Sequence, residues 1–152
     1  MLDRRPRQGN GLLAGPCRLQ TVSAMTDQGL PPAARFHHGI DFSRSFDRGQ
    51  KAGGRHCLVL VRPRGRQQDG GVRCGRLGVM VSTKVAALAV RRHALKRWVR
   101  ELFRLRLKER LDGWDCAVVF RSDPPDHTAC DAEVLALVER ALAAKAEGRR
   151  RR

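Results

Sequence analysis

Apolar residues between positions 84 and 110 recur at intervals of three and four residues, which is the period of one face of an α-helix. Drawn at about 100° per residue, they fall within an arc of about 120°. The residues on this arc are Leu88, Leu95, Trp98, Val99, Leu102 and Leu105. Because an arc of this width is typical of a helix that lies against a core, the pattern predicts one long amphipathic helix over residues 84–110.

Three shorter segments have the apolar, β-branched composition of strands. They are residues 55–62 (RHCLVLVR), 76–82 (RLGVMVS) and 115–121 (DCAVVFR), and Gly or Pro residues follow or separate them. Residues 63–75, between the first two segments, are polar and rich in glycine. This composition predicts a hairpin loop that joins two successive strands.

Two further helices are predicted outside the strands. In residues 39–48, Phe42 and Phe46 are spaced to share one helix face, and Gly49 follows as a predicted C-cap. Near the C-terminus, Thr128 or Asp131 can cap a last amphipathic helix.

The order of elements is therefore α-β-β-α-β-α. It predicts a single α+β domain, a sandwich with helices packed on one sheet.

The two ends of the chain lack such periodicity. Residues 1–34 are predicted to be a disordered extension, and Met25 within it is a candidate initiator. The folded domain is predicted to span residues 35–146, with residues 147–152 as a basic C-terminal tail. Every apolar run is far shorter than the roughly 20 residues that cross a bilayer, and no secretory signal is evident. We therefore expect a cytoplasmic protein without a membrane partner.

The charge of the chain indicates that this α+β domain binds an anionic partner. The chain has 31 Lys and Arg against 15 Asp and Glu, a formal net charge of +16. Cations follow one another at i, i+4 spacing on the face opposite the apolar arc of the long helix. They are Arg92, Lys96, Arg100, Arg104 and Lys108. A face of one sign that is rich in arginine favours the phosphates of nucleic acid as its partner.

No set of residues in the sequence predicts a metal site or a catalytic group. The cysteines have no Cys-x-x-Cys spacing, and Cys57 and Cys116 fall in apolar runs, so we predict them to be core residues. Four acids are predicted to lie in loops or at strand edges, as caps and turns: Asp112, Asp115, Asp123 and Asp126. A helix-turn-helix DNA regulator is disfavoured, because the long helix has no interruption, and no DNA partner is expected.

Residues 81–104, VSTKVAALAVRRHALKRWVRELFR, resemble the signature of the protein subunit of bacterial ribonuclease P. In that family a strand ending in Val-Ser/Ala-Lys-Lys precedes a helix with Arg-Asn-Arg-x-Lys-Arg-x-x-Arg-Glu-x-Phe. The matching residues here are Lys84, Arg92, Lys96, Arg97, Arg100, Glu101, Phe103 and Arg104. The departures are Thr83 for the first lysine, His93 for the Asn and Ala94 for the second Arg of the Arg-Asn-Arg element.

Two further elements of the family are similar in this chain. Phe42, Phe46 and Gly49 resemble its Asp-Phe-x-x-Val-Phe-x-x-Gly element, and residues 113–115 followed by CAVVF resemble its Gly-Tyr-Asp strand entry. The resemblance implies a fold like the second domain of ribosomal protein S5, a ribosomal-protein-S5-domain-2-like fold. It also implies a left-handed βαβ crossover, against the general right-handed rule.

The resemblance implies that the catalyst is the partner RNA, so that this chain supplies no catalytic residue and binds no cofactor alone. Mg²⁺ is held through the RNA subunit. The implied partners are ribonuclease P RNA and precursor tRNA, whose 5′ leader is removed. The residues implied to bind RNA are Lys84, Arg91, Arg92, His93, Lys96, Arg97, Arg100 and Arg104.

The resemblance also implies that Phe42 and Phe46 line a cleft for the single-stranded leader. Single strands are bound by cationic grooves with aromatic platforms, so the chemistry fits, but packing of both rings in the core remains an open alternative. The alternative function is a structural RNA-binding protein of ribosomal type without a role in cleavage.

Overall fold

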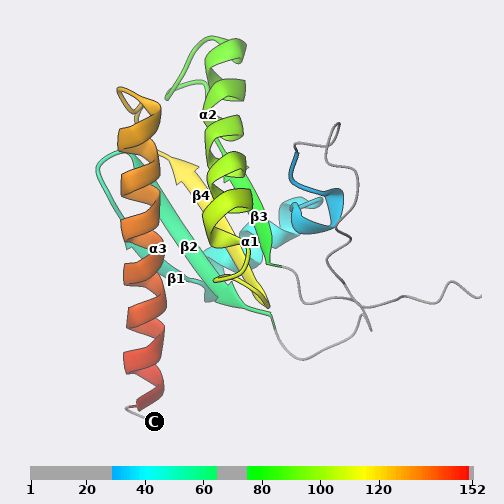
Figure 1. Cartoon of the computed structure of the whole chain (residues 1–152), viewed down its shortest axis with the longest axis vertical. Helices are drawn as coiled ribbons and strands as arrows, with labels where there is room; N and C mark the ends of the chain where they lie inside the picture. Colours follow the sequence, from blue (N-terminus) through cyan, green and yellow to red (C-terminus); the bar gives the residue numbers. More distant parts are fainter. Residues whose placement is uncertain (1–28, 65–74, 151–152) are drawn as a thin grey trace, which may run out of the picture.

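The computed structural model describes residues 29–64 and 75–150 (Figure 1). Its elements are the 3₁₀-helix η1 (Pro32–Ala34), α1 (Gly39–Arg48), β1 (Gln50–Gly53), β2 (Cys57–Pro63), β3 (Arg76–Met80), α2 (Ala89–Leu102), the π-helical turn η2 (Phe103–Leu107), β4 (Trp114–Phe120) and α3 (His127–Arg150). The predicted α+β class is confirmed. The order contains one strand more than predicted.

The additional strand, β1, carries little sequence signal. Its four residues, QKAG, include one apolar side chain, Ala52, so they show neither alternation nor β-branched composition. β1 pairs antiparallel with β2, where Ala52 lies opposite Val59. Pairing with a strongly apolar neighbour therefore produces a strand that local propensity does not predict.

The strands of the sheet are ordered β1-β2-β4-β3. β4 pairs antiparallel with β2 and parallel with β3. Because β4 lies between β2 and β3, the prediction that residues 63–75 form a hairpin loop is wrong. The composition of this segment is typical of a turn, but a local pattern cannot show that a later strand, β4, lies between the two strands that the segment connects. Residues 65–74 of this segment lie outside the described residues.

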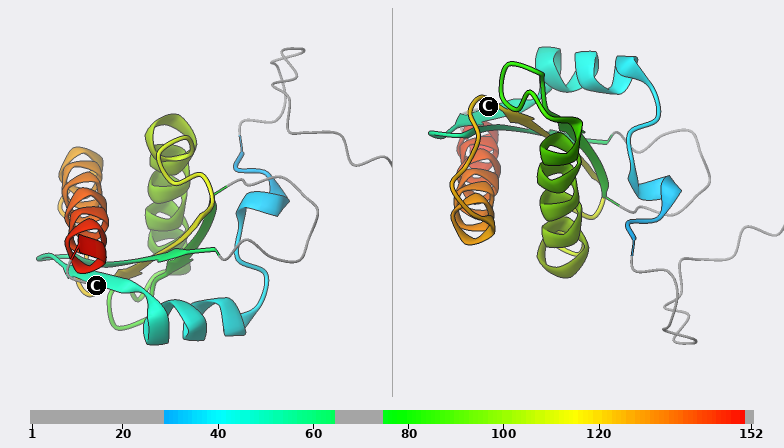
Figure 2. Two further views of the ribbon diagram at one scale, coloured as in Figure 1. Left: turned by 90° about the horizontal axis from the view of Figure 1, so that it is seen from below. Right: turned by 90° about the horizontal axis from the view of Figure 1, so that it is seen from above.

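Helices cover both faces of the sheet. Figure 2 shows α1 on one face and both α2 and α3 on the other. The main core lies between the sheet and the α2/α3 layer, and Cys57 and Cys116 are fully buried in it, as predicted. On the other face of the sheet, α1 packs across β2 and β4.

The basic helix begins later than predicted. Residues 84–88 form turns and bends, and Leu88 is the N-cap of α2 with 74% of its surface exposed. The carbonyls before the helix have other partners: the Arg92 guanidinium donates to the oxygens of Ala86 and Ala87 at 2.9 and 2.7 Å. Leu88 therefore does not belong to the core-facing arc, and Lys84 does not belong to the helix.

After Leu102 the helix changes pitch. In η2 the Lys108 N–H donates to the Phe103 oxygen at 2.8 Å, an i→i+5 bond of a π turn. This wider turn directs Phe103 and Leu107 into the core and leaves Leu105 64% exposed. The prediction that Leu105 lies on the buried arc is wrong, because that arc assumed a constant α-helical pitch.

The fold extends past both predicted boundaries. Leu30 and Ala34 are 2% and 0% exposed and belong to the core, and α3 continues to Arg150. The rest of the predicted extension, including Met25, lies outside the described residues. In the described part of the chain, no helix combines the length and apolar character needed to cross a membrane.

The cap of α3 differs from the prediction. The Asp126 carboxylate accepts the Ala129 N–H at 2.7 Å, which is the geometry of an N-cap. Neither Thr128 nor Asp131 has this role, since both lie inside the helix.

Candidate nucleic-acid interface

The structure divides the residues predicted to bind RNA into two groups. Three of them donate hydrogen bonds to acceptors of the protein itself: Arg91, Arg92 and Arg104. The others have no side-chain hydrogen bond or ion pair within residues 29–64 and 75–150: Lys84, His93, Lys96, Arg97 and Arg100. The second group is the one whose donors are available to a ligand.

Arg91 connects α2 to the loop before α3. Its guanidinium donates to the Asp123 carboxylate at 3.0 Å and to the Pro124 oxygen at 2.9 Å. It also lies over the Trp98 ring, 4.9 Å from the centroid. The Trp98 ring also stacks on the ring of His127, with the two ring centroids 5.1 Å apart. Arg91 therefore fastens α2 to the loop before α3 at the edge of the basic face.

Arg104 of η2 is paired with the last turn of α2. It donates to Glu101 at 2.6 Å, an i, i+3 ion pair. Arg92, as described above, supports the turn that precedes α2. The i, i+4 row predicted from the sequence is thus not uniform: Arg92 and Arg104 have structural contacts, whereas Lys96 and Arg100 between them have no partner in the described residues.

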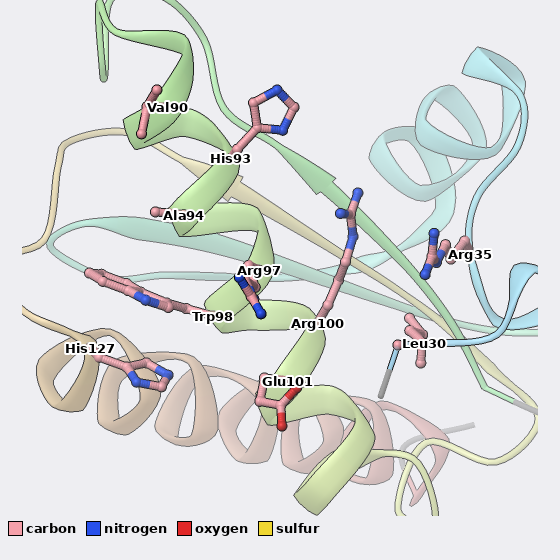
Figure 3. Close-up of a pocket in the computed structure, with 11 residues that line it drawn as sticks. Leu30, Arg35, Val90, His93, Ala94, Arg97, Trp98, Arg100, Glu101 and His127 are labelled. Atoms are coloured by element: carbon pink, nitrogen blue, oxygen red, sulfur yellow. The ribbon is translucent and has the colours of Figure 1, made fainter. Parts of the chain in front are cut away.

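A pocket of about 1040 Å³ lies along the exposed side of α2. His93, Arg97 and Arg100 line it from the helix, and Arg35 lines it from the segment before α1 (Figure 3). Ala94, which replaces the second Arg of the family motif, is also in its wall, so a small side chain stands where the motif has a long cationic one. The pocket is cationic, since the carboxylate of Glu101 is already paired.

Arg35 is the residue at this site that the sequence did not reveal. It lies outside the basic helix, at the predicted domain boundary, and only the packing of the N-terminal segment brings it to α2. Burial lowers the pKa of Arg100, and the positive charge of Arg35 lowers it further. The two guanidiniums are therefore close enough to repel each other.

The predicted leader-binding residues lie on the other face of the sheet. Phe42 and Phe46 are both half-buried on α1. The Phe42 ring meets Phe36 edge-on, with centroids 5.0 Å apart. Both of these rings press on Gly78 of β3, where an added Cβ would lie 2.4 Å from Phe36 and 2.7 Å from Phe42. Phe42 therefore packs on the sheet, and the assignment of Phe42 and Phe46 to leader binding stays a prediction.

Asp115 anchors α1 to this face. It is fully buried in β4 and accepts hydrogen bonds from Arg62 at 2.6 Å and from Arg76 at 2.9 Å, while Arg76 also pairs with Asp41 of α1 at 3.1 Å. Burial alone would raise the pKa of Asp115, but the bonds and charges of Arg76 and Arg62 hold it below its usual value. The prediction that Asp115 serves as a cap or turn is wrong, because its partners are distant in sequence.

Comparisons with known proteins agree with these features. The family model of Ribonuclease P matches residues 30–143. The ribonuclease P protein component of Pseudomonas aeruginosa is 41% identical over 81 residues, which cover 53% of this chain and 55% of that protein. The component from Microcystis aeruginosa is 30% identical over 105 residues, covering 69% of this chain and 83% of that protein.

Solved structures show the same architecture. The RNase P protein of Thermotoga maritima superposes with a TM-score of 0.55 at 30% identity, covering 70% of this chain and 96% of that one. The RNase P protein of Staphylococcus aureus has a TM-score of 0.62 at 23% identity, covering 71% and 94%, and supports the fold alone.

The aligned part of this chain spans about half the length of the curated relatives from Azotobacter vinelandii and Pseudomonas aeruginosa, at 49% and 55%. The family match, however, runs from the segment before α1 to α3 and so includes the sheet, the basic helix and its pocket. This chain belongs to the ribonuclease P protein family.

Proposed function

We propose that this chain is the protein subunit of ribonuclease P, which binds the catalytic RNA and assists the removal of the 5′ leader from precursor tRNA. The observation that carries the proposal is the set of cations on α2 without partners in the described residues, within the segment that matches the family. Phosphates bind such cations with little competition, because no internal ion pair must first be broken.

The RNA-binding surface is formed by two kinds of residue. His93, Arg97 and Arg100 present free donors along the pocket, while Arg91 and Arg92 hold the helix and its preceding turn in place. In this proposal Mg²⁺ held by the RNA supplies the chemistry of cleavage, and the protein contributes binding and orientation. Such a role also agrees with the predicted cytoplasmic location.

The leader is proposed to lie on the α1 face of the sheet. On this face, the strand register places three apolar residues opposite one another on neighbouring strands: Leu58, Val119 and Met80. Leu58 and Val119 are half-buried, and Met80 is 40% exposed. The helix α1, which carries Phe46, lies on the same face of the sheet. In this proposal the apolar residues and the Phe46 ring offer apolar contact and stacking to unpaired bases, worth about 1–3 kcal/mol for each stacked base.

The finer description of the fold is part of the same proposal. The parallel pairing of β3 and β4, with α2 between them in sequence, makes β3-α2-β4 a crossover unit. Membership of the family supports a left hand for this crossover and a fold like the second domain of ribosomal protein S5.

The test is a reconstituted reaction. The purified protein is mixed with a bacterial ribonuclease P RNA and precursor tRNA at a Mg²⁺ concentration at which the RNA alone is slow. We expect the protein to accelerate leader removal, and we expect no cleavage without the RNA. The matched variant replaces Lys96, Arg97 and Arg100 with Ala and should lose the acceleration.

Two results would contradict the proposal. Tight RNA binding without any acceleration would indicate the alternative, a structural RNA-binding protein. Acceleration that survives in the triple variant would show that α2 is not the face that binds the RNA.

A further inference from the structure

Arg35 and Arg100 approach the same gap from two separate elements. The backbone of Arg35 is fixed, because its N–H donates to the Pro32 oxygen at 3.0 Å and the residue bridges to Leu77 of β3. Arg100 stands on α2, opposite. Figure 3 shows the two side chains on either side of the gap between the helix and the N-terminal segment, with Leu30 beside them.

Neither guanidinium has an acidic partner within residues 29–64 and 75–150. The Nε atom of Arg35 is buried and has no hydrogen-bond partner there. Glu101, the acid in the wall of the same pocket, is engaged by Arg104. A buried donor without a partner and two adjacent like charges both carry a free-energy cost in the unliganded protein. An anion between the two side chains offsets the repulsion between their charges.

We propose that Arg35 and Arg100 together bind a single phosphate group of the catalytic RNA, which ties the segment before α1 to α2. This inference rests on the proposed function, because it takes the phosphate from that RNA. The guanidinium geometry suits the ligand, since each arginine presents a planar set of donors to two phosphate oxygens. The site adds to the RNA interface a residue that lies outside the helical motif.

The test is a double-mutant cycle of RNA binding measured over a range of salt concentrations. The variants are Arg35→Gln, Arg100→Gln and the double variant. The matched control is Arg55→Gln, which removes an equal charge from an exposed position between β1 and β2, at the sheet edge opposite β3. The binding partner is a bacterial ribonuclease P RNA.

If both side chains hold one phosphate, each single variant should weaken binding about fivefold to tenfold and lower the log–log salt slope by about 0.7–0.9. The log–log salt slope of the double variant should fall by no more than that of either single variant, because all three variants remove the same phosphate contact. The control should change affinity by less than about twofold. Additive slopes would assign the two arginines to separate phosphates and overturn the proposal, as would unchanged binding of Arg35→Gln.

Thermal unfolding of the free protein separates binding from structure. Arg35→Gln removes one of two repelling charges, so its Tm should stay the same or rise. A lower Tm that accompanies the weaker binding would make Arg35 a structural residue and would also overturn the proposal.

Failure of this inference is distinguishable from failure of the proposed function. Normal acceleration of leader removal by the wild type, with Arg35→Gln binding like the wild type, would overturn the shared phosphate alone. Coupled losses for Arg35 and Arg100 on a structured RNA, with no acceleration by the wild type, would support the shared phosphate site while the proposed function fails.

Discussion

At the scale of single residues, neighbouring arginines of one helix have different roles. Arg91 is enclosed by Asp123, Pro124 and Trp98, whereas Arg97 is exposed and has no side-chain partner in the part of the chain that the structure describes. Residue type and spacing predict the basic face, but only the direction of each side chain separates the cations that hold the protein together from those that can reach a phosphate.

We therefore expect opposite phenotypes for Arg91→Ala and Arg97→Ala. Arg91→Ala loses a partly exposed ion pair and a cation–π contact, which should lower the free energy of unfolding by about 1 kcal/mol. Arg97→Ala should leave stability within about 0.5 kcal/mol and weaken RNA binding. Urea unfolding and RNA titration of both variants provide the measurement. If the two variants lost RNA affinity equally and were equally stable, Arg91 would contribute to RNA binding as much as Arg97 does, despite its internal contacts.

The aromatic pair of α1 offers a second comparison of this kind. Phe46→Leu should keep most of the apolar volume but remove a stacking surface, at a cost of at most about 1–3 kcal/mol per stacked base in leader-dependent binding. Phe42→Leu should instead lower stability by about 1 kcal/mol, because the Phe42 ring packs against Phe36 and Gly78. The assay compares the affinity of the holoenzyme for precursor tRNA with a long and a one-nucleotide leader. Unchanged discrimination by Phe46→Leu would return this ring to a packing role.

At the scale of elements, the structure differs from the predicted helix most clearly where α2 passes into η2. The 3.6-residue period correctly located a buried stripe through Leu95, Val99 and Leu102. It could not indicate the π turn, because that turn follows from the burial of Phe103 and Leu107 against the rest of the fold. Similarly, β1 is a strand because β2 pairs with it, and the local sequence of β1 does not predict this pairing.

The change of pitch leads to a prediction that contrasts two leucines of η2. Leu107→Ala should lower the free energy of unfolding by about 2–4 kcal/mol, since its side chain is 1% exposed, and Leu105→Ala should change it by less than about 0.5 kcal/mol. Chemical denaturation of the two variants measures this difference. A regular α-helix through this region would give the reverse ranking.

At the scale of the whole molecule, one ion-pair network joins four elements. Asp115 of β4 holds Arg62 of β2 and Arg76 of β3, and Arg76 reaches Asp41 of α1. The sequence identifies each residue but not the network, because its members are brought together by the sheet order. The same limitation applies to the strand order itself, since local patterns located β2, β3 and β4 but not which of them are neighbours.

This network predicts acid sensitivity. The folded state lowers the pKa of Asp115, so its ion pairs stabilise the protein above the usual carboxyl value of 3.8, and the stabilisation is lost as pH falls through the lower, folded pKa. Asp115→Asn should cost about 3–5 kcal/mol at neutral pH, because it removes the fully buried carboxylate from Arg62 and leaves Arg76 with Asp41 as its acidic partner. Urea unfolding at about pH 7 and about pH 3 should then show a smaller pH dependence for the variant. An identical loss of stability on acidification in both proteins would remove Asp115 from this role.

The insertion of β4 between β2 and β3 also determines when the protein can fold during synthesis. β2 and β3 leave the ribosome first, yet the strand that pairs with both of them follows α2 and ends at Phe120. At about 5–20 residues per second, the nascent chain spends several seconds with the apolar edges of two strands unpaired. The sheet is therefore completed late, and substitutions that delay the entry of β4 should first appear as a lower yield of soluble protein in the cell, before any change in the stability of the finished fold.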